Sequence, residues 1–315
     1  MKILIKPGRS QNVIATNAIG GNYYESWLKW AYPTWEKYCE RHELGLIVFD
    51  TNIDDDGKKP YWQKLLIGDA LKNNVPDVKN VCFMDTDILI NYMAPNIFDS
   101  YDPNTIALVS QNDNLPYPFM SVRRRIAFFR HTFYDRDYPL DSWLFASLEQ
   151  IFERHDLPCQ KDFACTGLFI FNVRNHSDMM RSWYTKHNSD VKTLDGGTEQ
   201  VHLNYEIQNW GKVTWLDYRY QALWIYEMAW NYPFLYHCGR KDQQLIKQCI
   251  EASLFTNYFL HFAGAWEGNM WQIDGILQSE ESRRVLEDFS EYEKMPLTGE
   301  PKGIIKPKLS RSSGE

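Results

Sequence analysis

The chain has 315 residues, of which 44% are hydrophobic and 24% charged, and a formal net charge of −7 at pH 7. This length and hydrophobic fraction support one large or two modest folded domains and exclude a disordered chain. The acidic balance excludes a general nucleic-acid binder, which needs a basic surface, so no nucleic-acid partner is expected.

The first half of the sequence predicts strands and helices in alternation. Short apolar runs predict buried strands at 12–16, 45–50 and 81–85, and apolar residues at helical spacing predict helices at 23–41 and 62–71. The strands lack the polar–apolar alternation of a half-exposed sheet. Such strands, separated by helices, are typical of a mostly parallel sheet with helices on both faces, so the predicted fold class is α/β.

The second half continues with further strands and helices that are separated by longer irregular stretches. Apolar runs predict strands at 106–110, 168–173, 212–216 and 256–262. Helices are predicted at 142–155 and 198–210. Residues 114–141 are polar, aromatic and basic without a clean period, which predicts an irregular insertion. The folded domain is expected to cover 1–275, followed by a helical or disordered tail at 276–315.

Asp85 and Asp87 stand one residue apart at the carboxyl end of the predicted strand 81–85. Ligands bind at this end of the strands in open α/β sheets. The spacing lets one carboxylate ligate a hard cation directly while the other reaches it directly or through water, which suits Mg²⁺ or Mn²⁺. Apolar runs on both sides hold the two acids between buried segments, where a cation offsets their repulsion. The segment therefore predicts a metal site.

Two other functions use comparable residues. Phosphatases of the haloacid-dehalogenase type carry an Asp-x-Asp after a buried strand, and Asp85 would be the nucleophile. In those enzymes a Thr or Val stands two residues after the second Asp, where this chain has Leu89, and the motif usually lies close to the N-terminus. A non-enzymatic, calcium-assisted sugar-binding protein is the other alternative.

Further segments follow one another in the order of a known family. They are Thr16-Asn17 with Tyr23-Tyr24, Lys64 in Trp62-Gln63-Lys64-Leu65, Asp162 to Gly167, Asp195-Gly196-Gly197-Thr198-Glu199-Gln200 with Leu203-Asn204, and His261-Phe262-Ala263-Gly264. Together with Asp85-Thr86-Asp87 they span roughly 12–271. They resemble the retaining glycosyltransferases of the GT-A fold, in particular the glycogenin-like and galactosyltransferase-like (GT8-type) group. The resemblance implies a GT-A, Rossmann-like form of the α/β fold with a C-terminal extension.

The resemblance implies a role for each matching position. The residues that bind the donor are Ala15, Thr16, Asn17, Tyr24, Lys64, Thr86 and Gly264. The ligands of Mn²⁺ or Mg²⁺ are Asp85, Asp87 and His261. The catalytic residues are Glu199 and Gln200, which stabilise positive charge on the sugar, and Asp162, which holds its hydroxyls. A structural histidine and a helix N-terminal acid remain the alternatives for His261 and Glu199.

The implied reaction moves a sugar from a nucleotide-sugar, with UDP as the expected nucleotide, to a glycan or glycoconjugate hydroxyl with retention. The chain departs from the family at three places. Glu267 stands where a Lys pairs with the diphosphate, Cys165 replaces an Asn that touches the sugar, and Glu199-Gln200 replaces an Asp-Gln pair. Lys64 or a basic residue of 123–130 is then the candidate to neutralise the phosphates. These departures indicate a distant branch of the group.

The aromatic residues and the cysteines indicate less about the function than the motifs above. The 12 Trp and 19 Tyr side chains are mainly expected in the core. The stretch 224–236, with Trp266 and Trp271, is interpreted either as core or as a platform for the acceptor sugar. The six cysteines show no zinc-ligand spacing and predict reduced thiols, although a disulfide is not excluded.

The N-terminal apolar run is too short for a signal peptide, and no window of the sequence reaches the length of a membrane span. We therefore expect a cytoplasmic protein without a transmembrane segment. The basic residues after Pro301 permit at most a weak contact with an anionic membrane surface.

Overall fold

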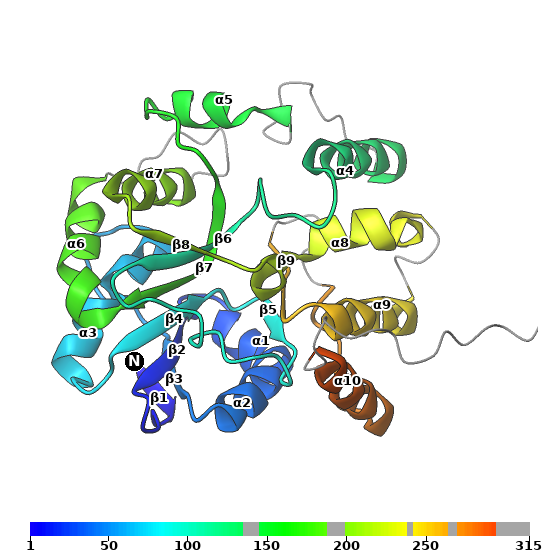
Figure 1. Cartoon of the computed structure of the whole chain (residues 1–315), viewed down its shortest axis with the longest axis horizontal. Coiled ribbons are helices and arrows are strands. Elements are labelled where there is room, and N and C mark those ends of the chain that lie inside the picture. Colours follow the sequence, from blue (N-terminus) through cyan, green and yellow to red (C-terminus); the bar gives the residue numbers. More distant parts are fainter. Residues whose placement is uncertain (135–144, 188–198, 238–241, 264–269, 294–315) are drawn as a thin grey trace, which may run out of the picture.

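The central feature of the structure is a seven-stranded sheet in the order β1-β3-β2-β4-β7-β6-β8 (Figure 1). The structure is a computed structural model that describes residues 1–134, 145–187, 199–237, 242–263 and 270–293. The strands are β1 (Lys2–Ile5), β2 (Asn12–Asn17), β3 (Gly45–Phe49), β4 (Asn80–Met84), β6 (Ile106–Ser110), β7 (Ala164–Asn172) and β8 (Val213–Leu216).

Most strands of this sheet run in one direction. β2 pairs in parallel with β3 and β4, and β6 pairs in parallel with β8. β7 is antiparallel to both β4 and β6, and β1 is antiparallel to β3 at the edge. The predicted α/β class with a mostly parallel sheet is confirmed. The short edge strand β1 was not predicted, and its first residues are exposed.

Both faces of the sheet are buried along its central strands, which explains the absence of polar alternation in their sequences. Val81 and Phe83 of β4 belong to one core, while Cys82 and Met84 belong to the other. The first core is covered by η1 (Pro60–Leu66), α3 (Ile67–Asn74), α6 (Val173–Lys186) and α7 (Gln200–Trp210). The second is covered by α1 (Tyr23–Trp30), α2 (Tyr32–Arg41) and a small sheet.

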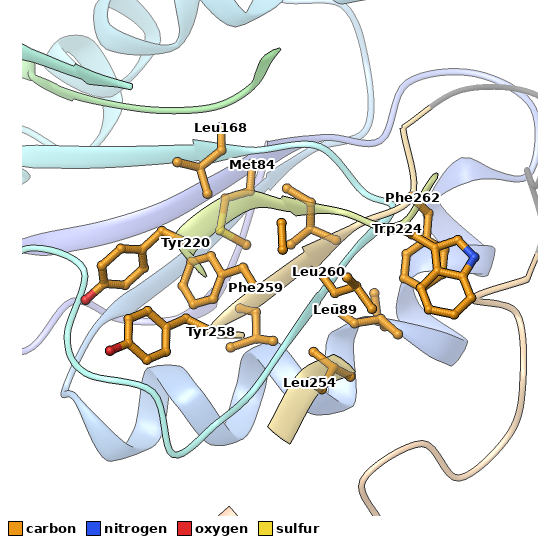
Figure 2. Packing of buried hydrophobic residues seen from close by; sticks show 14 of the residues in the cluster. Met84, Leu89, Leu168, Tyr220, Trp224, Leu254, Tyr258, Phe259, Leu260 and Phe262 are labelled. Carbon is orange, nitrogen blue, oxygen red and sulfur yellow. The ribbon is translucent and has the colours of Figure 1, made fainter. Parts of the chain in front are cut away.

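The small sheet has the order β5-β10-β9, formed by β5 (Ile88–Ile90), β10 (Phe259–His261) and β9 (Ala222–Leu223). In Figure 2, Met84 and Leu168 of the central sheet lie over Phe259 and Leu260 of β10. Around it pack η4 (Tyr218–Gln221), α8 (Trp224–Asn231), η5 (Pro233–Tyr236) and α9 (Gln243–Thr256). β10 is antiparallel to β5, with His261 opposite Ile88. This pairing brings the C-terminal histidine next to the segment that follows β4.

Two predicted elements differ from the structure. The helix expected at 23–41 is divided at Ala31 into α1 and α2, and Pro33 lies in the first turn of α2, where its missing N–H costs no hydrogen bond. The irregular insertion expected at 114–141 contains the helix α4 (Phe119–Tyr134), so that prediction is wrong for these residues. Arg123 and Arg130 are only 4% and 1% exposed. Because these charged residues occupy buried positions of α4, the helical spacing of its apolar residues is interrupted in the sequence.

The other predicted elements lie near their predicted positions, whereas the helices α6, α8 and α9 were not predicted. α5 (Leu148–Glu153) is shorter than the helix predicted at 142–155, of which residues 142–144 lie outside the described part. α10 (Glu280–Glu293) lies in the predicted tail, and the basic residues after Pro301 fall outside the described residues. In the described part of the chain, no helix combines the length and the apolar composition that a membrane crossing needs. The five cysteines of that part carry free thiols, and Cys238 lies outside it.

Candidate metal centre and adjoining cavity

Asp85 and Asp87 follow the end of β4 and are held there by backbone hydrogen bonds to two neighbouring segments. The N–H of Asp85 donates to the carbonyl of Gly167 on β7 at 2.8 Å. The N–H of Phe262 donates to the carbonyl of Asp87 at 3.0 Å. The central sheet thus positions the first aspartate, and the chain leaving β10 positions the second.

The structure brings together the three residues that were predicted as metal ligands. His261 Nε2 lies 3.2 Å from Asp87 Oδ1 and 3.9 Å from Asp85 Oδ2. One ligand atom from each side chain falls within 4.8 Å of the others. The His261 side chain is 2% exposed, whereas those of Asp85 and Asp87 are 40% and 31% exposed. The trio is therefore open to a ligand on its carboxylate side.

Gly167 leaves the space that this trio occupies. A Cβ at position 167 would lie 2.3 Å from His261 Cε1 and 2.6 Å from Asp85 Oδ2. Any other residue here would push the ligands apart. Two carboxylates and an imidazole also form a suitable donor set for a divalent cation such as Mn²⁺. The residues present therefore fit a bound divalent cation.

The three groups differ in how readily they ionise. Burial and the Asp87 carboxylate raise the pKa of Asp85, and they outweigh the opposing charge of Lys64. Burial disfavours the charged form of Asp87, but the charge and hydrogen bond of His261, with smaller contributions from a backbone hydrogen bond and Lys64, together outweigh it and lower the pKa of Asp87. Burial likewise opposes the charge of His261, yet Asp87 raises the pKa of His261 well above its usual range. The two acids are thus electrostatically unequal, with Asp87 the more readily ionised.

Lys64 lies beside the trio and links it to Glu199. Its Nζ is 2.7 Å from Glu199 Oε1 and 3.8 Å from Asp85 Oδ1, and it donates to the carbonyl of Thr166 at 3.1 Å. Burial alone lowers the pKa of Lys64, but the carboxylates of Asp85 and Glu199 reverse this effect and raise it. Lys64 therefore stays charged and compensates part of the negative charge of the site.

A cavity of about 650 Å³ opens in front of this cluster. Its wall includes Lys64, Asp85, Thr86 and Asp87 on the side of the central sheet. The rest of its lining consists of Asn17, Ile19, Asn22, Tyr23, Ser26, Pro60, Tyr61, Phe83, Trp271 and Gln272. Charged ligand groups and aromatic side chains therefore face one shared space large enough for a small ligand.

The predicted donor-binding residues divide into those that reach the cavity and those that do not. Asn17 and Thr86 line it, as does Lys64. Ala15 and Thr16 are fully buried in β2 and are not part of the lining. Tyr23 lines the cavity, and Tyr24 is not among the lining residues. The ring of Tyr24 instead packs against Lys2, whose Nζ lies 4.0 Å from the ring centroid. Gly264 lies outside the described residues.

The predicted catalytic residues sit behind this wall. Glu199 is 2% exposed, and its Oε1 accepts from Thr166 Oγ1 at 2.7 Å as well as from Lys64. Asp162 is 6% exposed and accepts from Ser110 Oγ at 2.9 Å. Gln200 begins α7, where its carbonyl accepts from Asn204 Nδ2 at 2.9 Å. None of the three belongs to the cavity lining that the described residues form.

Sequence reasoning did not assign a site role to several residues that the structure brings close. Tyr61 and Gln272 line the cavity, and Gln221 lies against His261. Trp271 was expected either in the core or at an acceptor platform; it is 6% exposed, packs edge-on to Trp30 at 6.1 Å and lines the cavity. The high aromatic content was a signal for such residues, but composition alone does not separate a cavity wall from a core.

Comparison with known proteins finds similarity in backbone arrangement alone. Neither a protein-family model nor a curated protein sequence matches the chain. A solved glycosyltransferase involved in glycosylation of the major capsid of PBCV-1 aligns with 11% identity and a TM-score of 0.47, covering 82% of this chain and 97% of that one. The galactosyltransferase LgtC, solved with donor and acceptor sugar analogs, aligns with 13% identity and a TM-score of 0.46, covering 92% and 98%.

A third similar structure is the glycosyltransferase GlyE of Streptococcus pneumoniae, with 11% identity and a TM-score of 0.43 over 92% of this chain and 66% of that one. These solved structures are glycosyltransferases, the class that the sequence motifs resemble. At this level of similarity a shared substrate does not follow.

Proposed function

We propose that the protein is a metal-dependent glycosyltransferase of the GT-A type, which moves a sugar from a nucleotide-sugar, in the first place a UDP-sugar, to a hydroxyl of a glycan or other acceptor. The observation that carries the proposal is the cluster of Asp85, Asp87 and His261 beside a cavity of about 650 Å³. The first two of these residues line that cavity. A nucleoside diphosphate sugar needs such a combination of a cation site with space for a base and a sugar.

Asp85, Asp87 and His261 would hold the divalent cation. When bound, Mn²⁺ or Mg²⁺ supplies a Lewis acid that stabilises negative charge on the departing diphosphate. Lys64 contributes a fixed positive charge 3.8 Å from Asp85, and its burial prevents water from screening that charge. The same ammonium fixes Glu199 by an ion pair, so the carboxylates are held in place before the donor binds.

Aromatic side chains in the rest of the cavity wall favour the binding of flat ring systems. Tyr23 is 62% exposed and projects at the edge of the cavity, and Tyr61 and Trp271 form further parts of its wall. A nucleobase stacks favourably on such rings whatever its identity. We infer that the base of the donor lies against Tyr23, with its diphosphate directed to the cation trio.

Retention and the catalytic roles of Glu199, Gln200 and Asp162 remain part of the proposal. The contacts of Glu199 favour an electrostatic role in catalysis, because Lys64 and Thr166 hold its Oε1 in a fixed position. A buried negative charge behind the cavity wall would favour the positively charged transition state of sugar transfer. The anomeric configuration of the product, measured by NMR, tests retention.

Two alternatives make different predictions at the same residues. A phosphatase would use Asp85 as a nucleophile, but here Asp85 contacts Lys64 and its neighbour Asp87 contacts His261. An imidazole among the ligands favours a cation site over a pair of acids that performs nucleophilic attack. A sugar-binding protein would bind glycan with no affinity for a nucleotide.

The proposal is tested by calorimetric titration of UDP, GDP and CMP, and of their sugar conjugates, with and without Mn²⁺. We expect Mn²⁺-dependent binding of one nucleotide class, which Asp87→Asn abolishes. Asp77→Asn, in an exposed turn before β4, is the matched control and should bind as the wild type does. No Mn²⁺-dependent binding of any nucleotide would refute the proposal. Asp85-dependent hydrolysis of a generic phosphate ester would instead establish the phosphatase.

A further inference from the structure

Within the described part of the chain, Gln221 is the closest polar side chain to the inner nitrogen of the His261 ring. It is fully buried at the end of η4, and its Nε2 lies 3.1 Å from His261 Nδ1. β9 begins at the next residue and pairs in parallel with β10, with Leu223 opposite His261. The two side chains are therefore held in register by the same small sheet.

The opposite nitrogen of the same ring faces the proposed cation. Nε2 lies 3.2 Å from Asp87 Oδ1 and 3.9 Å from Asp85 Oδ2. A nitrogen binds a cation through its lone pair, so Nε2 must be free of a proton when the site is loaded. The ring proton then resides on Nδ1 and requires an acceptor there.

The amide of Gln221 can supply this acceptor. With Nε2 directed to His261, its Oε1 is buried and has no hydrogen-bond partner among the described residues. The neighbouring Gln111 donates to the backbone carbonyl of Gln221 at 3.4 Å, and its own buried Oε1 likewise has no partner in the described part of the chain. A half-turn of the Gln221 amide exchanges its two ends at almost no change in shape. The half-turn brings an acceptor to Nδ1 and moves the Gln221 oxygen away from the buried position where it has no partner among the described residues.

We propose that Gln221 is a positioning residue, which accepts the Nδ1–H of His261 through Oε1 and so directs the Nε2 lone pair to the cation. The inference rests on the proposed cation site. Cys165 also lies near Nδ1, at 3.6 Å, but a thiol is a weak partner at this distance. The amide therefore carries the orienting bond.

The first test measures Mn²⁺ affinity by calorimetry in three variants. Gln221→Met fills the same space without an amide, and we expect Mn²⁺ to bind about 10- to 100-fold more weakly. Gln221→Glu keeps an oxygen acceptor and removes the donor, so its affinity should fall less than in Gln221→Met. Cys165→Ala should bind Mn²⁺ as the wild type does. Wild-type affinity in Gln221→Met, an equal loss in Gln221→Glu, or a loss confined to Cys165→Ala would each overturn the inference.

The second test needs no cation. Nitrogen-15 NMR of the metal-free wild-type protein should show a slowly exchanging proton on Nδ1 of His261, and Gln221→Met should accelerate its exchange. A proton found on Nε2 alone would overturn the inference. If the wild-type protein binds no Mn²⁺ in the first test, the proposed function fails, while this spectrum still decides whether Gln221 accepts from Nδ1.

Discussion

Lys64 and Glu199 form an ion pair inside the protein, with Nζ and Oε1 2.7 Å apart and side chains only 4% and 3% exposed. Thr166 binds both members, because its carbonyl accepts from Lys64 and its hydroxyl donates to Glu199. Among the described residues, Asp85 is the other carboxylate in contact with Lys64, at 3.8 Å. The donor side of the proposed site is therefore built on a buried charge pair that joins η1, β7 and the start of α7.

Removing one member of this pair should cost more stability than the loss of its own contacts, because the other member remains as a buried charge. Lys64→Met leaves Glu199 charged and buried, and Glu199→Gln leaves Lys64 with Asp85 alone, so each should cost about 3–5 kcal/mol. The double variant should cost clearly less than the sum of the two, because neither charge remains uncompensated. Urea unfolding of the four proteins measures this coupling. Additive losses would show that the two side chains do not act as a pair.

Much of the fold was predictable because it depends on local pattern. β2, β3 and β4 are buried on both faces and appear in the sequence as unbroken apolar runs. Asp85 and Asp87 follow the last of these runs, so their place at a strand end could be inferred. α4 could not, because buried arginines replace apolar residues on its inner face.

The rest of the site depends on contacts between segments far apart in the chain. Gln221 and Gly167 belong to it only because β10 pairs with β9 and because β7 lies next to β4. Tyr23 and Tyr24 are adjacent in sequence, and the path of α1 alone decides which ring faces the cavity. No pattern in a single sequence encodes these pairings, whereas the resemblance to a known family did indicate His261.

The exposed ring of Tyr23 should contribute to nucleotide binding. Tyr23→Ala removes a stacking surface at the edge of the cavity and should weaken binding of the preferred nucleotide by about 10-fold or more, while Tyr23→Phe should retain it. Because the side chain is 62% exposed, stability should change little. Tyr24→Ala is the comparison, since this ring packs under Lys2. Calorimetric titration would contradict the assignment if Tyr24→Ala weakened binding and Tyr23→Ala did not.

Gly167→Ala should impair the cation site without unfolding the protein. The new Cβ would lie 2.3 Å from His261 Cε1 and 2.6 Å from Asp85 Oδ2, so both ligands must move. We expect Mn²⁺ affinity to fall by about 10-fold or more. Gly211→Ala provides the converse control, because Gly211 ends α7 at φ 86° and alanine there should cost about 1 kcal/mol of stability. That variant should bind Mn²⁺ normally, and a similar loss in both would point to a global effect.

A cluster of histidines away from the cavity should make the fold sensitive to acid. His202 stacks on His187 with ring centroids 4.6 Å apart, and His155 lies edge-on to it at 5.4 Å. Burial, followed by the neighbouring His187 and His155, lowers the pKa of His202 to about 4 from the ordinary 6.5. The folded state therefore prefers the neutral ring.

The sign of the effect follows from proton linkage. Below pH 6.5 the unfolded chain binds a proton at His202 before the folded protein does, so this contribution to stability is complete above pH 6.5 and is lost as the pH falls towards 4. His202→Phe keeps an aromatic ring against His187 and Trp62 but cannot be protonated, so its melting temperature should decline less over this range. His131→Gln, at an exposed position of α4, should keep the wild-type decline. An equal decline in His202→Phe and the wild type would show that His202 does not determine this acid sensitivity.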